Sequence, residues 1–180
     1  MTHWIVDLMM HSLFLSFIVA GGFTLIYHQA KKEKRKGILH VFLFAFYMCN
    51  LFYITVVREG FFTNETGVIN LIPMVQMLEN YKHAALQYPL QSFMYLVYNI
   101  LGNIVWFMPF GYMLHNFVKR ISLKKVILYS FMLSFYIELG QYVLRVGISD
   151  IDDIILNTLG GMLGYIVYRW LHTERKKDEH

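Results

Sequence analysis

The sequence predicts an all-α protein, a polytopic membrane bundle of about five transmembrane helices. Hydrophobic residues make up 57% of the 180 residues and charged residues only 16%, with a mean hydropathy of +0.43. Soluble domains carry about a quarter charged residues and under half apolar ones. Five spans of about 20 residues each would use more than half of the chain. The length therefore leaves room for a single membrane domain.

Five apolar stretches account for the expected spans, because each is near the length that crosses about 30 Å of hydrocarbon. They cover residues 4–27, 38–57, 92–114, 126–144 and 154–171. A signal peptide is the alternative for the first stretch, but it would need a basic segment at its start. The chain begins Met1-Thr2-His3, and its first basic run follows the stretch. We expect an uncleaved span.

The distribution of Lys and Arg predicts the orientation, since retained cytoplasmic loops accumulate positive charge. Basic residues cluster after the first span, after the third span and in the tail, at Lys31, Lys32, Lys34, Arg35, Lys36, Lys119, Arg120, Lys124, Lys125, Arg169, Arg175, Lys176 and Lys177. The opposite side keeps only Arg58, Lys82 and Arg145. We expect an external N-terminus and a cytoplasmic C-terminus. Clusters that flank spans favour membrane lipids as partners, and they do not favour nucleic acid.

These spans define four regions. Residues 1–57 hold two N-terminal transmembrane helices with a basic cytoplasmic loop, 58–91 form an outer-side loop or interfacial segment, 92–171 form a three-helix core, and 172–180 form a cytoplasmic tail. The outer segment contains Asn70-Leu71-Ile72-Pro73, and its apolar part from Val68 to Leu78 could lie in the headgroup interface as a short helix. A loop of this length usually carries structure or function.

Polar residues recur at helical spacing inside the last three spans. One stripe holds Ser134, Glu138, Gln141 and Arg145; another holds Asp153, Asn157, Gly160 and Gly164; a third holds Asn99 and Asn103, followed by Pro109 and Gly111. Intramembrane polar groups usually face the interior of a bundle. The expected depths converge on an outward-facing pocket in the outer half. We expect its lining to be Asn99, Asn103, Gln141, Arg145, Asp150, Asp152, Asp153 and Asn157, with Glu138 as the candidate catalytic group.

Each of these features also has a structural interpretation. Glu138 could pair with Arg145 or an amide and hold helices together. The carboxylates from Asp150 to Asp153 could cap a helix N-terminus, with Ser149 or Asp150 as N-cap, or could form a metal or acid/base cluster. Gly160, Gly161 and Gly164 favour close helix packing over substrate contact. Pro109 should bend or loosen its helix.

Cysteine and histidine suggest no redox or metal chemistry. Cys49 is the single cysteine, so the chain has no CxxC motif and no intramolecular disulfide. The eight histidines show no HExxH motif or paired spacing. We expect no metal site and no cofactor.

The ordered set of motifs resembles the VanZ-like family of bacterial membrane proteins. The matching residues are Asn70-Leu71-Ile72-Pro73, the run from Asn103 through Pro109 to Gly111, Ser134-x3-Glu138-x2-Gln141, and Asp150-x2-Asp153-x3-Asn157 followed by Gly160, Gly161 and Gly164. The resemblance carries site roles onto Asn103, Glu138, Gln141, Asp150, Asp153 and Asn157. Asn70, Pro73, Pro109, Gly111 and the three later glycines would be structural.

The resemblance implies a bacterial, multi-pass cell-membrane protein that gives low-level resistance to teicoplanin-type glycopeptides without replacing the cell-wall precursor. Reduced drug access at the outer membrane face would fit the expected pocket, and a lipoglycopeptide or a cell-wall or lipid precursor would be the partner. The alternative is a membrane enzyme acting on a lipid-linked envelope substrate, with Glu138 as acid or base, Arg145 holding an anion and the Asp150–Asp153 carboxylates holding a divalent cation. A proton-coupled transporter is the third hypothesis.

Overall fold

The structure is a computed structural model that describes residues 2–31, 35–57 and 68–178. Its elements, in chain order, are α1 (Thr2–Lys31), α2 (Arg35–Phe52), a π-helical turn (Tyr53–Val57), β1 (Val68–Asn70), α3 (Val75–Ala85), α4 (Pro89–Met113), a 3-10 turn (Leu114–Asn116), α5 (Leu123–Leu144), β2 (Ile148–Asp150) and α6 (Ile151–Asp178). The chain divides into two compact units, Met1–Gly60 and Phe61–His180.

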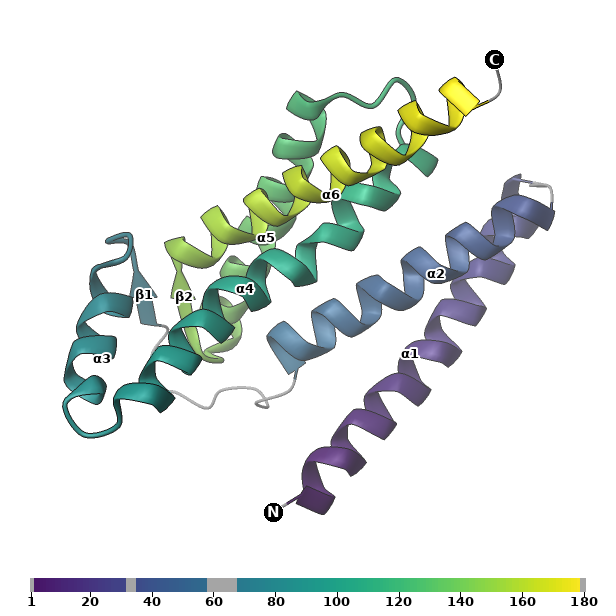
Figure 1. Ribbon diagram of the computed structural model, residues 1–180. Coiled ribbons are helices and arrows are strands. Elements are labelled where there is room, and N and C mark those ends of the chain that lie inside the picture. The colour runs from purple at the N-terminus through teal and green to yellow at the C-terminus, as the bar shows by residue number, and fades with distance from the viewer. Residues whose placement is uncertain (1, 32–34, 58–67, 179–180) are drawn as a thin grey trace. The chain divides into compact units, whose positions relative to one another are not determined.

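The first unit is an antiparallel hairpin of α1 and α2 (Figure 1). Phe17 of α1 meets Phe42 of α2 edge to face, with ring centroids 5.3 Å apart. Ala20 and Ala45 are buried, and the hydroxyl of Thr24 donates to the carbonyl of Ala20 within the same helix. Small residues and an internally bonded hydroxyl suit helices whose outer surfaces are apolar.

The second unit is a core of three long helices, in which α6 packs against both α4 and α5. Ser122 caps the start of α5, where its side chain accepts a hydrogen bond from the Lys125 backbone amide. Arg145 ends that helix in a left-handed conformation, φ 56°, and its backbone N–H donates to the carbonyl oxygens of Gln141 and Tyr142. Pro109 lies within α4, which ends at Met113 and tightens into the 3-10 turn.

Glycines allow α6 to approach its neighbours at backbone distance. A Cβ atom added at Gly160 would overlap the carbonyl of Ile104, and one at Gly164 would overlap the carbonyl of Met108, both on α4. Gly111 meets Gly161 in the same way, and a side chain at Gly161 would also overlap Ser130 of α5. The Gly160–Gly164 spacing therefore serves packing within one chain.

Three helical segments are long and apolar enough to cross a membrane: Gly37–Val56, Pro89–Asn116 and Leu123–Leu144. A shorter apolar helical segment covers Leu13–Gln29. Large apolar side chains such as Phe93, Tyr98 and Leu101 of α4 lie on the surface, as expected for helices that face lipid. The predicted all-α membrane-like bundle is confirmed. The number of five spans and the orientation remain predictions, since α6 does not meet the same criteria within the described residues.

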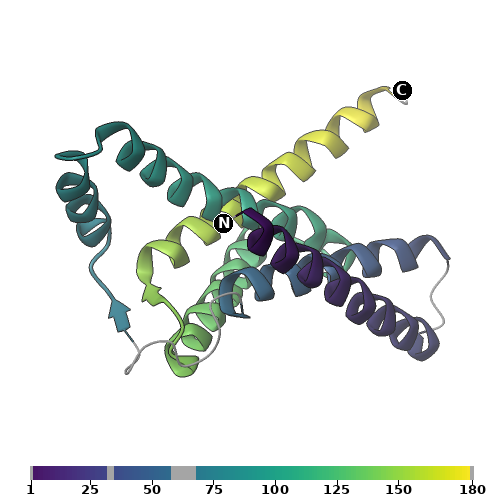
Figure 2. The ribbon, with the colours of Figure 1, turned by 90° about the horizontal axis from the view of Figure 1, so that it is seen from below.

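The segment before α4 differs from the short helix expected over Val68 to Leu78. Residues 68–70 form β1, which pairs in parallel with β2, and the helix begins only at Val75. Pro73 disfavours helical conformation at the residue before it, and Met74 is left-handed with φ 61°. Figures 1 and 2 both show α3 folded back beside the first turns of α4.

The register of the two strands is Val68 with Ile148, Ile69 with Ser149, and Asn70 with Asp150. Side chains alternate between the two faces of a strand. Asn70 and Asp150 therefore share one face of the ribbon, and Ile69 and Ser149 share the other. The pairing joins segments that lie about 80 residues apart in the sequence and brings the turn before α3 to the start of α6, where Asp152 accepts the backbone N–H of Met74.

Substitution of Gly164 should loosen the contact between α4 and α6. We expect Gly164→Ala to cost about 1–3 kcal/mol of stability, because its methyl group meets backbone that cannot move aside alone. Thermal unfolding of the purified protein in detergent measures the effect. Gly140→Ala on α5 is the matched control, since a Cβ there meets nothing within 4 Å. Equal melting temperatures for the two variants would contradict the assigned packing role.

Candidate functional site

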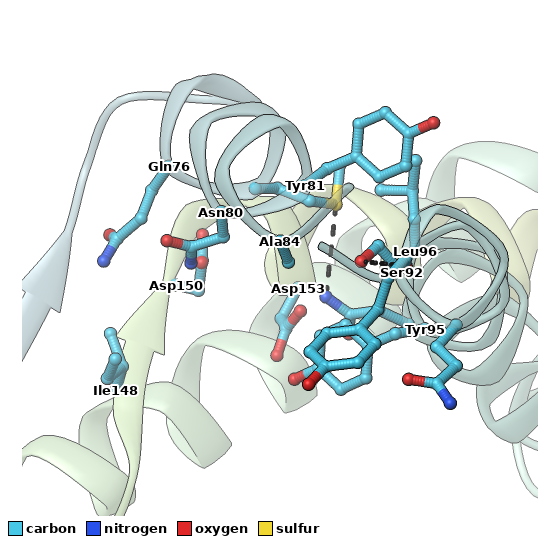
Figure 3. Close-up of a pocket in the computed structure, with 14 residues that line it drawn as sticks. Gln76, Asn80, Tyr81, Ala84, Ser92, Tyr95, Leu96, Ile148, Asp150 and Asp153 are labelled. Carbon is cyan, nitrogen blue, oxygen red and sulfur yellow. Dashed lines mark hydrogen bonds between the residues drawn. The ribbon is translucent and has the colours of Figure 1, made fainter. Parts of the chain in front are cut away.

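A cavity of about 580 Å³ lies between α3, the first half of α4 and the junction of β2 with α6 (Figure 3). Its volume is within the range of small-ligand pockets. The lining consists of two carboxylates, four side-chain amides, three phenols, one hydroxyl and four apolar side chains. These are Asp150, Asp153, Gln76, Asn80, Gln91, Asn99, Tyr81, Tyr88, Tyr95, Ser92, Met77, Ala84, Leu96 and Ile148.

Asp150 connects the wall of the cavity to the strand pair and to α6. Its Oδ2 accepts a hydrogen bond from Nδ2 of Asn70 at 3.0 Å, and its Oδ1 accepts from the backbone N–H of Asp152 at 2.9 Å. The second contact is that of an N-cap, which also places negative charge at the helix N-terminus. The capping interpretation of Asp150 thus matches the geometry, while part of its carboxylate still lines the cavity.

Asp153 lies in the first turn of α6, directly before the expected fifth span. Its Oδ1 accepts a short hydrogen bond from Nδ2 of Asn103 on α4. Burial, followed by repulsion from the Asp150 carboxylate, raises the pKa of the Asp153 carboxyl to about 6. The carboxyl therefore takes up a proton more readily than an exposed aspartate does, and a nearby cation would favour its charged form.

Asp152 holds the start of α3. Its side chain is only 6% exposed, and both of its oxygens accept the backbone N–H of Met74, at 3.0 and 2.9 Å. Asn70 supports the same turn, because its Oδ1 accepts from the backbone N–H of Ile72 at 3.3 Å. Asp152 therefore holds the turn that leads into α3, one wall of the cavity, and its own side chain is not part of the lining.

Glu138 lies beneath the cavity, outside its lining. It is 5% exposed, and its Oε2 accepts the backbone N–H of Asp150 at 2.8 Å. Its carbonyl oxygen accepts a short hydrogen bond from the hydroxyl of Ser149. Both contacts tie the strand β2 to α5, so the described geometry gives Glu138 a positioning role for Asp150.

Three further residues of the expected site lie away from the cavity lining. Asn157 is 4% exposed and donates from Nδ2 to the hydroxyl of Ser134 at 2.9 Å, which joins α6 to α5. The backbone carbonyl of Gln141 accepts the N–H of Val146 at 2.9 Å, in the turn that closes α5. Arg145, exposed at the end of α5, forms the cap described above.

Of the residues that the sequence placed in the pocket, Asn99, Asp150 and Asp153 line the cavity, and Asn103 supports Asp153 from behind. The sequence analysis missed the wall formed by α3 and the start of α4. A signal was present there, because Met77, Asn80, Tyr81 and Ala84 repeat at helical spacing, as do Ser92, Tyr95, Leu96 and Asn99.

Within the described residues, no three His, Cys, Asp or Glu side chains are arranged to hold a metal ion. The cavity does offer a different chemistry. Its amides can donate and accept hydrogen bonds, its phenols can do both, and its two carboxylates can accept several bonds each. This combination suits recognition of a polar group that carries hydrogen-bond donors.

Removal of the Asp152 carboxylate should release α3. We expect Asp152→Ala to cost about 1–3 kcal/mol locally, because the N–H of Met74 loses its acceptor. Hydrogen–deuterium exchange should then quicken across residues 74–85. Glu79→Ala removes an exposed carboxylate from α3 itself and should leave that exchange unchanged. Equal protection of α3 in both variants would show that Asp152 does not hold this helix.

Comparison with known proteins agrees with the motifs. Protein VanZ of Enterococcus faecium is 35% identical over 69 residues, which are 38% of this chain and 43% of that relative, so the match spans less than half of the relative. No solved structure matches the chain. The model of the VanZ/LLP1 family matches residues 42–172, which include α3, α4, α5, most of α6 and every residue that lines the cavity. The chain belongs to the VanZ/LLP1 family.

Proposed function

We propose that this chain is a multi-pass protein of the bacterial cell membrane that lowers susceptibility to teicoplanin-type glycopeptides by reducing drug access at the outer membrane face. The supporting observation is the cavity between α3, α4 and the start of α6, with Asp150 and Asp153 in its wall. In the orientation expected from the basic loops, this end of the unit is external. A site there would meet a drug or an envelope precursor without transport across the bilayer.

A second, apolar cavity supports selectivity for acylated drugs. It has a volume of about 550 Å³ and lies between α5 and α6, where Phe131, Phe135, Ile155 and Leu159 are part of its wall. Burial of a hydrocarbon chain is favourable by about 0.8 kcal/mol per methylene group. A drug with an acyl chain would gain this free energy when the chain leaves water for the apolar groove and the surrounding lipid, whereas a glycopeptide without one would not.

The enzyme alternative depends on Glu138 as a general acid or base. A catalytic acid or base must come within hydrogen-bond reach of the reacting group. Glu138 is outside the lining of the cavity, and its Oε2 is bonded to the backbone of Asp150. These contacts favour the non-catalytic hypothesis.

Growth inhibition tests the proposal and separates the two hypotheses. A susceptible Gram-positive host expressing the chain should be protected from teicoplanin and a second acylated glycopeptide, but not from vancomycin. Asp153→Asn should reduce protection strongly, because it removes one of the two carboxylates of the cavity and the one with fewer hydrogen bonds from the described residues. Glu138→Gln should keep most protection, since its amide oxygen can still accept the N–H of Asp150.

Equal membrane levels of all variants, measured by immunoblotting, are the control, and Glu79→Gln provides a neutralised carboxylate outside the cavity. Loss of protection in Glu138→Gln, with a changed lipid profile, would favour the enzyme. Absence of any protection by the wild type would reject the resistance function for this chain.

A further inference from the structure

We propose that the cavity between α3, α4 and the start of α6 binds a primary ammonium group on a small scaffold rich in hydroxyl or amide groups, such as an amino sugar or an aminated lipid headgroup. This inference rests on the proposed function only in using the same cavity, and it names the chemistry that the cavity selects. Its basis is the set of charges, acceptors and aromatic rings in the wall.

The charged side chains in the wall of the cavity are all acidic. Asp150 and Asp153 line the cavity, and none of the described residues that line it is Lys, Arg or His. Two carboxylates in a partly enclosed space repel each other and lose hydration. A bound cation would relieve both costs, whereas a phosphate or carboxylate group would add to them. The cavity should therefore discriminate by the sign of the ligand's charge.

The two carboxylates are held in place and retain acceptor capacity. A carboxylate offers about four lone-pair sites. Asp150 uses its two oxygens for Asn70 and Asp152, and the side chain of Asp153 accepts one bond, from Asn103, among the described residues. The donors that orient these groups lie in β1, α4 and α6, so the acceptors are positioned before a ligand arrives. Such preorganisation lowers the cost of binding.

The remaining lining fits a polar ammonium compound better than a bare metal ion. Tyr81, Tyr88 and Tyr95 bring aromatic rings to the cavity, and ammonium groups are attracted to aromatic faces. Gln76, Asn80, Gln91 and Asn99 supply amides for hydroxyl or carbonyl groups. In Figure 3, Gln76 and Asn80 from α3 lie across from Ile148, Asp150 and Asp153. Divalent cations would prefer a denser set of oxygen ligands.

The size of the cavity sets the size of the group. A volume of about 580 Å³ can hold a single sugar unit or a lipid headgroup, but not a whole glycopeptide. A drug would therefore enter with one amine-bearing part, and the rest would remain outside. The shared chemistry is the ammonium group, and its source is either the antibiotic or a membrane lipid.

The first test compares glucosamine with N-acetylglucosamine, which differ in the ammonium group. The full chain is reconstituted in nanodiscs whose lipid is phosphatidylglycerol, a headgroup without an amine, and affinity is measured by saturation-transfer NMR. We expect glucosamine to bind at least about tenfold more tightly, the scale of one charge-assisted hydrogen bond. Asp153→Asn should abolish that preference, and Glu79→Gln should preserve it. Equal affinities for the two sugars in the wild type would overturn the proposal.

A second variant covers the case in which Asp153→Asn does not fold. Gln91→Lys adds a positive charge at an exposed position of the lining and keeps both carboxylates. It should weaken glucosamine binding by about tenfold more than N-acetylglucosamine binding, because both sugars lose the Gln91 amide but only glucosamine carries a charge that the new lysine repels. An unchanged preference in this variant would place the binding elsewhere and overturn the proposal. Displacement of glucosamine by stoichiometric Mg²⁺ would also overturn it, because it would assign the cavity to a metal ion.

Competition identifies the source of the ammonium group. Phosphatidylethanolamine added to the nanodiscs should displace glucosamine if the ligand is a lipid headgroup. Teicoplanin should displace it if the ligand is the drug, and teicoplanin with its amine acetylated should fail to do so. Displacement by either source supports the proposal, and displacement by acetylated and unmodified drug alike would overturn it.

The growth assay separates the two levels of inference. Protection from teicoplanin that needs Asp153, without any preference for glucosamine, would overturn the ammonium proposal and leave the proposed function intact. A clear preference for glucosamine in a chain that gives no protection would reject the proposed function alone.

Discussion

The interaction on which the functional end of the molecule depends is the hydrogen-bonded junction between residues 149–153 and their partners. Glu138 accepts the backbone N–H of Asp150, Asp150 accepts Asn70, and Asp152 accepts the N–H of Met74. Carboxylates are costly to bury unless donors satisfy them. Here the donors come from β2, from β1 and from the turn before α3. These hydrogen bonds offset the cost of burying the carboxylates, and they also position β1, β2 and α3.

The junction depends in turn on the close approach of α4 and α6. Gly160 and Gly164 allow the α4 backbone to lie against α6, and Asn103, between these contact points and the cavity, then reaches Asp153. Without a hydrophobic driving force inside lipid, helix association depends on such close packing and on interhelical hydrogen bonds. The small residues and the amide therefore act together, and the same contact that stabilises the bundle orients an acceptor in the cavity wall.

The sequence was sufficient for features that repeat locally. Helical periodicity placed Glu138, Asp153 and Asn157 on inward faces, and the Gly160–Gly164 spacing predicted close packing. It could not reveal that Asn70 pairs with Asp150, because β1 and β2 have three residues each and lie far apart in the chain. The α3 wall was missed for a related reason. One side of α3 is exposed, and the side that lines the cavity carries mainly amide and aromatic side chains. An ordinary surface helix can show the same pattern, so the sequence does not mark α3 as part of a site.

The acidic residues divide according to how many of their acceptors the fold uses. Asp152 directs both oxygens to Met74, and Glu138 is buried against the backbone of Asp150. Replacing either would disturb architecture first. Asp153 differs, because its one described side-chain bond, from Asn103, leaves most of its acceptor capacity directed at the cavity. Asp153 therefore has two roles in the geometry: one oxygen joins α6 to α4 through Asn103, and the rest of the carboxylate lines a space of ligand size.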